Sequence, residues 1–147
     1  MKKFILLGIV IFSFGASATN QTIEDLVKTH DEIVFQPAPE FEGLEVALIA
    51  GNPNAPGPYV LRAKFAAGIL SKPHSHDQIR HITVLKGIWH FGLGPSGSCD
   101  GTKPINAGGT ALHPKGVVHY DGACGSETIV EITGIGPVKT TFVKPAQ

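Results

Sequence analysis

Short stretches in which apolar and polar residues alternate recur along the chain, separated by glycine and proline. The clearest is residues 59–66 (YVLRAKFA), where Leu61 and Phe65 face one way and Arg62 and Lys64 face the other. Successive side chains of a strand project to opposite faces, so this pattern predicts a strand with one buried face. Arg62 and Lys64 are expected on its solvated face.

Several similar runs predict a series of short strands. They cover residues 45–50, 82–85, 88–93, 110–112, 117–120, 128–133 and 138–143. A short helix is expected only at residues 22–28, where Thr22 can cap the first turn, and residues 94–109 are typical of a long turn. Strands at this spacing, with no helices between them, indicate an all-β fold, an antiparallel barrel or double-sheet roll.

The first 18 residues have a different pattern. Lys2 and Lys3 precede an apolar run over residues 4–14, and Ala16-Ser17-Ala18 follows. This is the pattern of a bacterial secretory signal, with cleavage expected after Ala18. The apolar run is well short of the about 20 residues of a spanning helix, so we expect no stable membrane insertion. The mature chain is then residues 19–147, in the periplasm or secreted.

Composition supports one globular domain, because 42% of the 147 residues are hydrophobic and only 16% are charged. Without the first 18 residues, 10 Lys and Arg face 12 Asp and Glu. A net charge of −2 without a basic cluster argues against nucleic acid as a partner.

Export changes the interpretation of the two cysteines. Cys99 and Cys124 both lie in Gly- and Ser-rich segments, and an exported chain meets an oxidising compartment, which favours a disulfide between them. Two soft metal ligands or two free thiols are the alternatives. Neither cysteine has a second ligand nearby at metal-binding spacing.

Histidines supply the candidate chemistry. His74 and His76 are one residue apart, so on an extended strand both imidazoles project from one face and can reach one metal ion. Further along, Pro114 and Gly116 indicate a tight turn that delivers His119 into the next strand.

These residues fall into two spaced motifs. The first holds Gly68, His74, His76 and Gly87, and the second holds Gly108, Pro114, Gly116 and His119, with Ala123 where an Asn is usual. In this pattern the chain resembles a small single-domain exported cupin, similar to cupin-domain proteins of undefined activity. The resemblance implies a double-stranded β-helix, or jelly-roll barrel, and is compatible with a homodimer.

The resemblance also implies a divalent metal inside the barrel. Cupins usually bind it through the two histidines and the Glu of the first motif and the histidine of the second, here His74, His76 and His119. Arg80 stands in the place of the Glu, and the neighbouring register puts His81 there. An arginine has no lone pair for a metal, so it cannot replace the carboxylate.

Three interpretations remain open. Three neutral imidazoles can hold Fe, Zn, Mn, Ni or Cu with positions left open. Alternatively His81 or Gln78 supplies a fourth ligand. In the third interpretation the metal site is degenerate, and the barrel binds a ligand without metal.

Arg80 itself predicts an anionic ligand if it points inward, because a guanidinium is well shaped for a carboxylate or phosphate. The other interpretation is an arginine at the barrel mouth, paired with Asp77 or a surface Glu. Two functions follow: a metal-dependent enzyme, of oxygenase or isomerase type, on a small organic acid, or a non-catalytic small-molecule or metal-binding barrel.

The remaining candidates are given structural roles. His30, His90 and His113 are expected to be structural or exposed, Phe65, Trp89 and Phe91 are expected in the core, and Tyr120 or Asp121 could support the ligand His119 from behind.

Overall fold

The computed structural model describes residues 22–39 and 41–143 and divides the chain into two compact units, Met1–Glu32 and Ile33–Gln147. The predicted signal segment, residues 1–18, lies outside the described residues. In the first unit, α1 (Ile23–Leu26) and η1 (His30–Glu32) bury no side chain. The backbone N–H and the hydroxyl of Thr22 both donate to the Asp25 carboxylate at 2.9 Å, which fixes the start of α1. No helix in the described part of the chain has the length and apolar character to cross a membrane.

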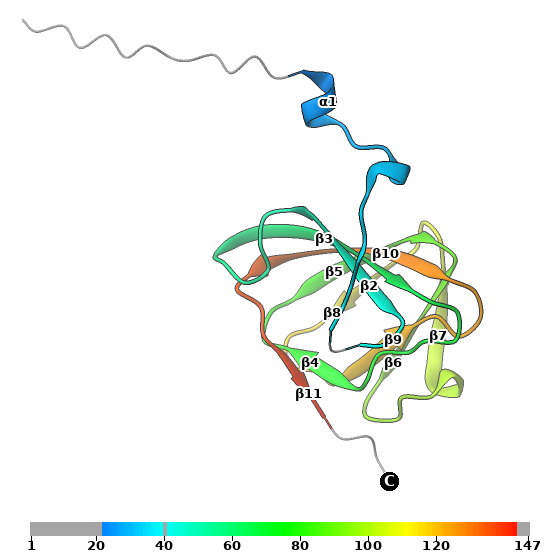
Figure 1. Cartoon of the computed structure of the whole chain (residues 1–147). Coiled ribbons are helices and arrows are strands. Elements are labelled where there is room, and N and C mark those ends of the chain that lie inside the picture. The colour runs from blue at the N-terminus through cyan, green and yellow to red at the C-terminus, as the bar shows by residue number, and fades with distance from the viewer. Residues whose placement is uncertain (1–21, 40, 144–147) are drawn as a thin grey trace, which may run out of the picture. The chain divides into compact units, whose positions relative to one another are not determined.

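The second unit consists of two antiparallel sheets (Figure 1). The first has the strand order β1 (Gln36–Pro37), β2 (Leu44–Ala50), β3 (Gly57–Phe65), β10 (Thr128–Gly136), β5 (Arg80–Lys86) and β8 (Thr110–His113). The second has the order β11 (Thr140–Phe142), β4 (His74–His76), β9 (His119–Gly122), β6 (Ile88–Leu93) and β7 (Thr102–Asn106). The predicted all-β double-sheet architecture is confirmed.

The core takes side chains from both sheets, at the inward positions of each alternating strand. In β5, Ile82 and Val84 are buried, whereas His81 and Thr83, which alternate with them, are exposed. The full core cluster is Tyr59, Ala63, Phe65, Ile82, Val84, Trp89, Ala123, Val130 and Ile132. Phe91 is only partly buried and packs against this cluster.

Several boundaries differ from the sequence prediction. The segment expected to be a long turn contains η2 (Cys99–Gly101) and the strand β7. Pro104 argued against a strand here, because proline cannot donate a backbone hydrogen bond. β7 lies at the edge of its sheet, where a missing backbone N–H is tolerated. β9 begins at His119 rather than at residue 117, and β11 covers only Thr140–Phe142 of the predicted 138–143.

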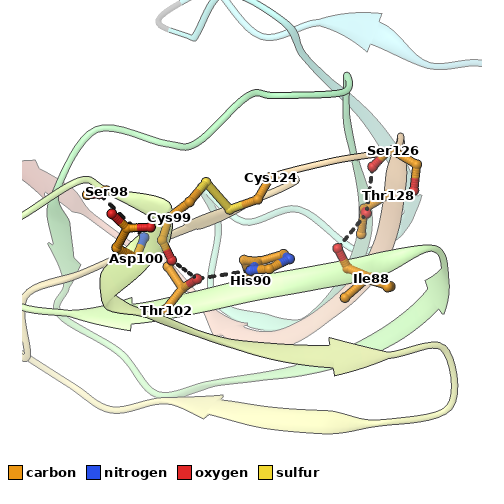
Figure 2. Close-up of a disulfide and its surroundings, with 9 residues drawn as sticks. All are labelled: Ile88, His90, Ser98, Cys99, Asp100, Thr102, Cys124, Ser126 and Thr128. Carbon is orange, nitrogen blue, oxygen red and sulfur yellow. Dashed lines mark hydrogen bonds between the residues drawn. A yellow bond between two sulfur atoms is a disulfide. The ribbon is translucent and has the colours of Figure 1, made fainter.

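The disulfide between Cys99 and Cys124 is present (Figure 2). It ties η2, which precedes the edge strand β7, to the loop that follows β9. Beside it, the Thr102 hydroxyl donates to the Cys99 carbonyl at 2.6 Å and accepts from His90 Nδ1 at 2.9 Å (Figure 2). His90 therefore has the structural role that the sequence predicted.

Candidate metal centre

Three histidines converge between neighbouring strands of the second sheet. His74 and His76 lie on one face of β4, and His119 pairs directly opposite His74 across the β4–β9 ladder. All three are buried, with ring centroids 4.8 Å (His74–His76), 4.5 Å (His74–His119) and 5.2 Å (His76–His119) apart. One ring nitrogen of each lies within 4.8 Å of those of the other two. The structure thus brings together the three residues that the motifs singled out.

Each of these rings has an oxygen partner at Nδ1. The contacts are His74 with the Lys72 carbonyl (2.7 Å), His119 with the Val117 carbonyl (2.9 Å) and His76 with the Thr140 hydroxyl (3.1 Å). A carbonyl only accepts, so Nδ1 of His74 and His119 carries the proton and Nε2 keeps its lone pair. Such outer partners set the tautomer and the orientation of ligating histidines.

Burial keeps the three rings neutral. The pKa of His74 is lowered to about 4 and that of His76 to about 2, chiefly by burial and partly by the positive charge of Arg80. Burial also lowers the pKa of His119. Near neutral pH the three Nε2 lone pairs are therefore not lost to protons, and a set of neutral imidazoles fits Zn, Fe, Ni or Cu. Nε2 of His119 is buried and has no hydrogen-bond partner among the described residues, as expected of a donor atom awaiting a ligand.

Arg80 points into this site. Its Nη2 contacts Nε2 of His76 and lies 2.9 Å from Nδ1 of His113. A guanidinium can only donate, so both ring nitrogens accept; His76 therefore carries its proton on Nδ1 and donates it to Thr140. Asp77 instead accepts from the backbone N–H of Lys139 at 2.7 Å. Arg80 is thus not the mouth residue paired with Asp77 that the sequence left open.

The proposed fourth ligands lie elsewhere. His81 is exposed and follows Arg80 in β5, so its side chain projects to the opposite face of the strand. Gln78 is half-buried in the turn between β4 and β5. Neither belongs to the histidine group or lines the cavity beside it, so the structure does not support them as ligands.

His113 belongs to the site, although it was expected to be structural or exposed. It pairs opposite Arg80 across the β5–β8 ladder and is 1% exposed. Its Nε2 lies 3.4 Å from Oδ2 of Asp121, which follows His119 by two residues on β9. Along β8 the more buried positions, Ala111 and His113, alternate with exposed Thr110 and Leu112. The sequence carries no clear signal of this, because the apolar Leu112 lies on the exposed face.

Asp121 is the buried carboxylate of the site. Burial raises its pKa, and the nearby positive charge of Arg80 and the His119 ring oppose that rise. His113, His119 and Asp121 also form a group whose ligand atoms lie within 4.8 Å of one another. A carboxylate is therefore present near the histidines, but on β9 and not in the first motif.

A cavity of about 180 Å³ opens beside these groups. Its polar lining is Ser71, His74, His76, Arg80, His113, Asp121 and Thr140. Most of the remaining wall is apolar and includes Phe41, Leu44, Val46, Leu61, Phe65 and Ile132. The site can therefore present histidine nitrogens and one guanidinium to a ligand whose body is surrounded by hydrocarbon.

Comparison with known proteins gives one curated relative. A germin-like protein from Mesembryanthemum crystallinum is 31% identical over 88 residues, which cover 56% of this chain. The chain spans only 38% of that relative's length. No family model matches the chain.

Solved structures share the architecture at low identity. An RmlC-like cupin from Shewanella frigidimarina is 19% identical, with a TM-score of 0.57 over 74% of this chain and 87% of that one. The polyketide cyclase RemF from Streptomyces resistomycificus is 16% identical, with a TM-score of 0.61 over 80% of this chain and 87% of that one. A salicylate 1,2-dioxygenase and a sugar phosphate isomerase have similar folds. The resemblance drawn from the two motifs is confirmed at the level of architecture: the chain has the cupin fold.

Proposed function

We propose that this protein is an exported metal-dependent enzyme, of oxygenase or isomerase type, that acts on a small anionic organic substrate. His74, His76 and His119 hold the divalent metal, and Arg80 binds the anionic group of the substrate. The observation that carries the proposal is the convergence of three buried, neutral imidazoles whose Nδ1 atoms all have oxygen partners. That arrangement leaves three nitrogen donors directed at one point.

The metal, Arg80 and the apolar wall of the cavity have separate roles in this proposal. A bound metal would supply Lewis-acid or oxygen-activating chemistry. Arg80 orients the substrate by its charge, and the apolar wall excludes water from around the reacting group. Solved cupin-fold structures include a dioxygenase, an isomerase and a cyclase, so the fold alone does not select the reaction.

Elemental analysis tests the proposal. Wild type is reconstituted separately with Fe, Mn, Zn, Ni and Cu and compared with a His74→Ala/His119→Ala double variant. We expect about one metal per chain in wild type and no stoichiometric metal in the double variant, which keeps one of the three ligands. The matched control is His81→Ala, which removes an exposed histidine from the same barrel and should bind as wild type does. Wild type without stoichiometric metal under any of the five conditions would rule the proposal out.

A second candidate is a non-catalytic barrel that binds a small molecule without metal. It is favoured by the contact of the Arg80 guanidinium with Nε2 of His76, where a metal would bind. If this candidate is right, exhaustive chelation leaves ligand binding unchanged. If the metal centre is right, chelation weakens it.

A further inference from the structure

Arg80 is a charged group whose hydrogen-bond partners are neutral. Among the described residues, no Asp or Glu lies within 4.0 Å of its guanidinium, and Nη2 contacts the rings of His76 and His113. The guanidinium also interacts with the phenol of Tyr59, whose pKa is raised by burial and which therefore stays neutral. Asp121 attracts it, but the His113 ring lies between them, 2.9 Å from Arg80 Nη2 and 3.4 Å from Asp121 Oδ2. A carboxylate carries a full negative charge and two oxygens that match the guanidinium fork, so it would be a better partner for Arg80 than a neutral imidazole, which offers one lone pair.

The same contact occupies a metal donor. Nε2 of His76 has one lone pair, and that lone pair accepts from Arg80 in this structure. A metal on His74, His76 and His119 needs the same lone pair. Arg80 in this position and a three-histidine metal therefore exclude each other at His76.

We infer that Arg80 couples two ligands in this cavity: a divalent metal on the three histidines, and a small carboxylate with an apolar body. The carboxylate draws the guanidinium away from His76, which frees Nε2 for the metal. By linkage, each ligand strengthens the binding of the other by the same factor. The inference rests on the proposed function. It adds the class of substrate, and it adds that carboxylate binding promotes metal binding.

The lining of the cavity selects the class of anion. Arg80 is the single Lys or Arg among the described residues that line it, which suits one anionic group. The wall around it is mostly hydrocarbon, so the many hydroxyl groups of a sugar phosphate would find few partners to replace the water that they lose. A cavity of about 150 Å³ accommodates benzene. The 180 Å³ here accordingly fits the body of a small aromatic or alicyclic acid.

Titration of the protein with Zn²⁺ in three backgrounds tests the coupling. The metal-free protein is titrated alone, with benzoate as the anionic probe, and with benzamide as its neutral counterpart of similar shape. For wild type we expect benzoate to lower the apparent Kd for Zn²⁺ by about tenfold, within the range of ordinary coupling energies, and benzamide to leave it unchanged. Zn²⁺ should in turn tighten benzoate binding by the same factor.

The variants isolate the guanidinium. Arg80→Met keeps a long side chain without charge, and should bind Zn²⁺ more tightly than wild type and show no response to benzoate. The matched control is Arg62→Met, because Arg62 donates to Glu131 (3.1 Å) on the first sheet and does not line the cavity. It should keep the wild-type response.

The outcomes separate this inference from the proposed function. If wild type binds Zn²⁺ stoichiometrically but benzoate leaves its Kd unchanged, the coupling is wrong and the metal centre stands. The coupling is equally wrong if Arg80→Met responds to benzoate as wild type does, since benzoate would then act by direct contact with the metal. If neither wild type nor Arg80→Met binds Zn²⁺, the metal centre and the coupling both fail.

Discussion

Each candidate ligand is oriented by an oxygen that contacts its Nδ1 atom. Two of these oxygens are close to their histidine in the sequence, and the third is far from it. Those of Lys72 and Val117 are backbone carbonyls two residues before the histidine that they hold. The third is the Thr140 hydroxyl, 64 residues from His76, brought there by the β11–β4 ladder. Spacing along a strand could predict the three histidines, but it could not predict Thr140, because that contact depends on long-range strand pairing.

Replacing Thr140 should therefore weaken the metal centre without removing a ligand. In Thr140→Val the Nδ1–H of His76 loses its acceptor, so the ring is less firmly held in the tautomer that presents Nε2. We expect Zn²⁺ affinity to fall by about 10- to 100-fold, measured by competition with a chelator of known affinity. Thr141→Val removes the neighbouring exposed hydroxyl and is the control. Equal losses in both variants would show that the Thr140 contact has no special role.

Arg80 was predicted from the sequence as a residue of the site, whereas its partner His113 was not. Its place in the first motif marked it as the unusual residue of the site, and the structure puts its side chain in the cavity. Its partner His113 was not predicted as a site residue, because β8 exposes the apolar Leu112 and its sequence does not indicate which face is buried. His113 enters the site through its register with Arg80, which the sequence alone does not specify.

Among the elements, long alternating strands were predicted well and short or proline-containing ones were not. β3 has the alternation that identified it, with Tyr59, Ala63 and Phe65 buried, and β10 was predicted over residues 128–133 of Thr128–Gly136. β1 has two residues and ends in Pro37, and β7 contains Pro104, so neither shows a recognisable period. Both lie at a sheet edge, where pairing on one side suffices to hold them.

Gly122 ends β9 just after Asp121, and its backbone admits no side chain. Its φ is +151°, and a Cβ would lie 2.2 Å from the carbonyl oxygen of Ile69. Gly122→Ala should lower the free energy of unfolding by about 3 kcal/mol, read from urea denaturation. The control is Gly125→Ala, where a Cβ meets nothing within 4 Å. A Gly122→Ala protein as stable as that control would contradict the close approach of Ile69.

The disulfide acts at the same end of β9, because Cys124 follows Gly122 by two residues. Cys99 and Cys124 are 25 residues apart, and closing a loop of this length is worth roughly 3 kcal/mol in the chain-entropy model. The Cys99→Ser/Cys124→Ser variant should lose stability of this order, seen as an earlier urea midpoint. Reduction of wild type should give the same shift and a mass increase of about 2 Da. Unchanged stability in both cases would show that the bridge contributes nothing to the fold.

For the whole molecule, export remains the main untested prediction. When the full chain is produced in a bacterium with an intact secretion pathway, the protein recovered from the periplasm or medium should begin at Thr19. N-terminal sequencing and intact mass would show it, and the predicted composition is then 129 residues with a net charge of −2. A chain recovered only with Met1, inside the cell, would overturn both the cleavage and the localisation.

The architecture was predictable because two motifs carry the turns and the histidines of one fold. The order of strands in each sheet was not predictable from periodicity, since the neighbours β3 and β10 are separated by more than 60 residues of chain. The resemblance to cupins implied a double-stranded β-helix, and the order of strands comes from the structure. Periodicity alone predicts only an antiparallel barrel or double-sheet roll.

The position of β4 has a consequence for when the proposed metal site would be complete. β4 lies between β9 and β11, so the strand that bears His74 and His76 is flanked by segments that follow it by about 40 and 60 residues, and Thr140 lies almost at the end of the described chain. A partly synthesised or partly threaded chain therefore lacks the full set of three histidines and the Thr140 contact. A metal held by all three would be bound only after β9 and β11 are in place, in the compartment where folding finishes.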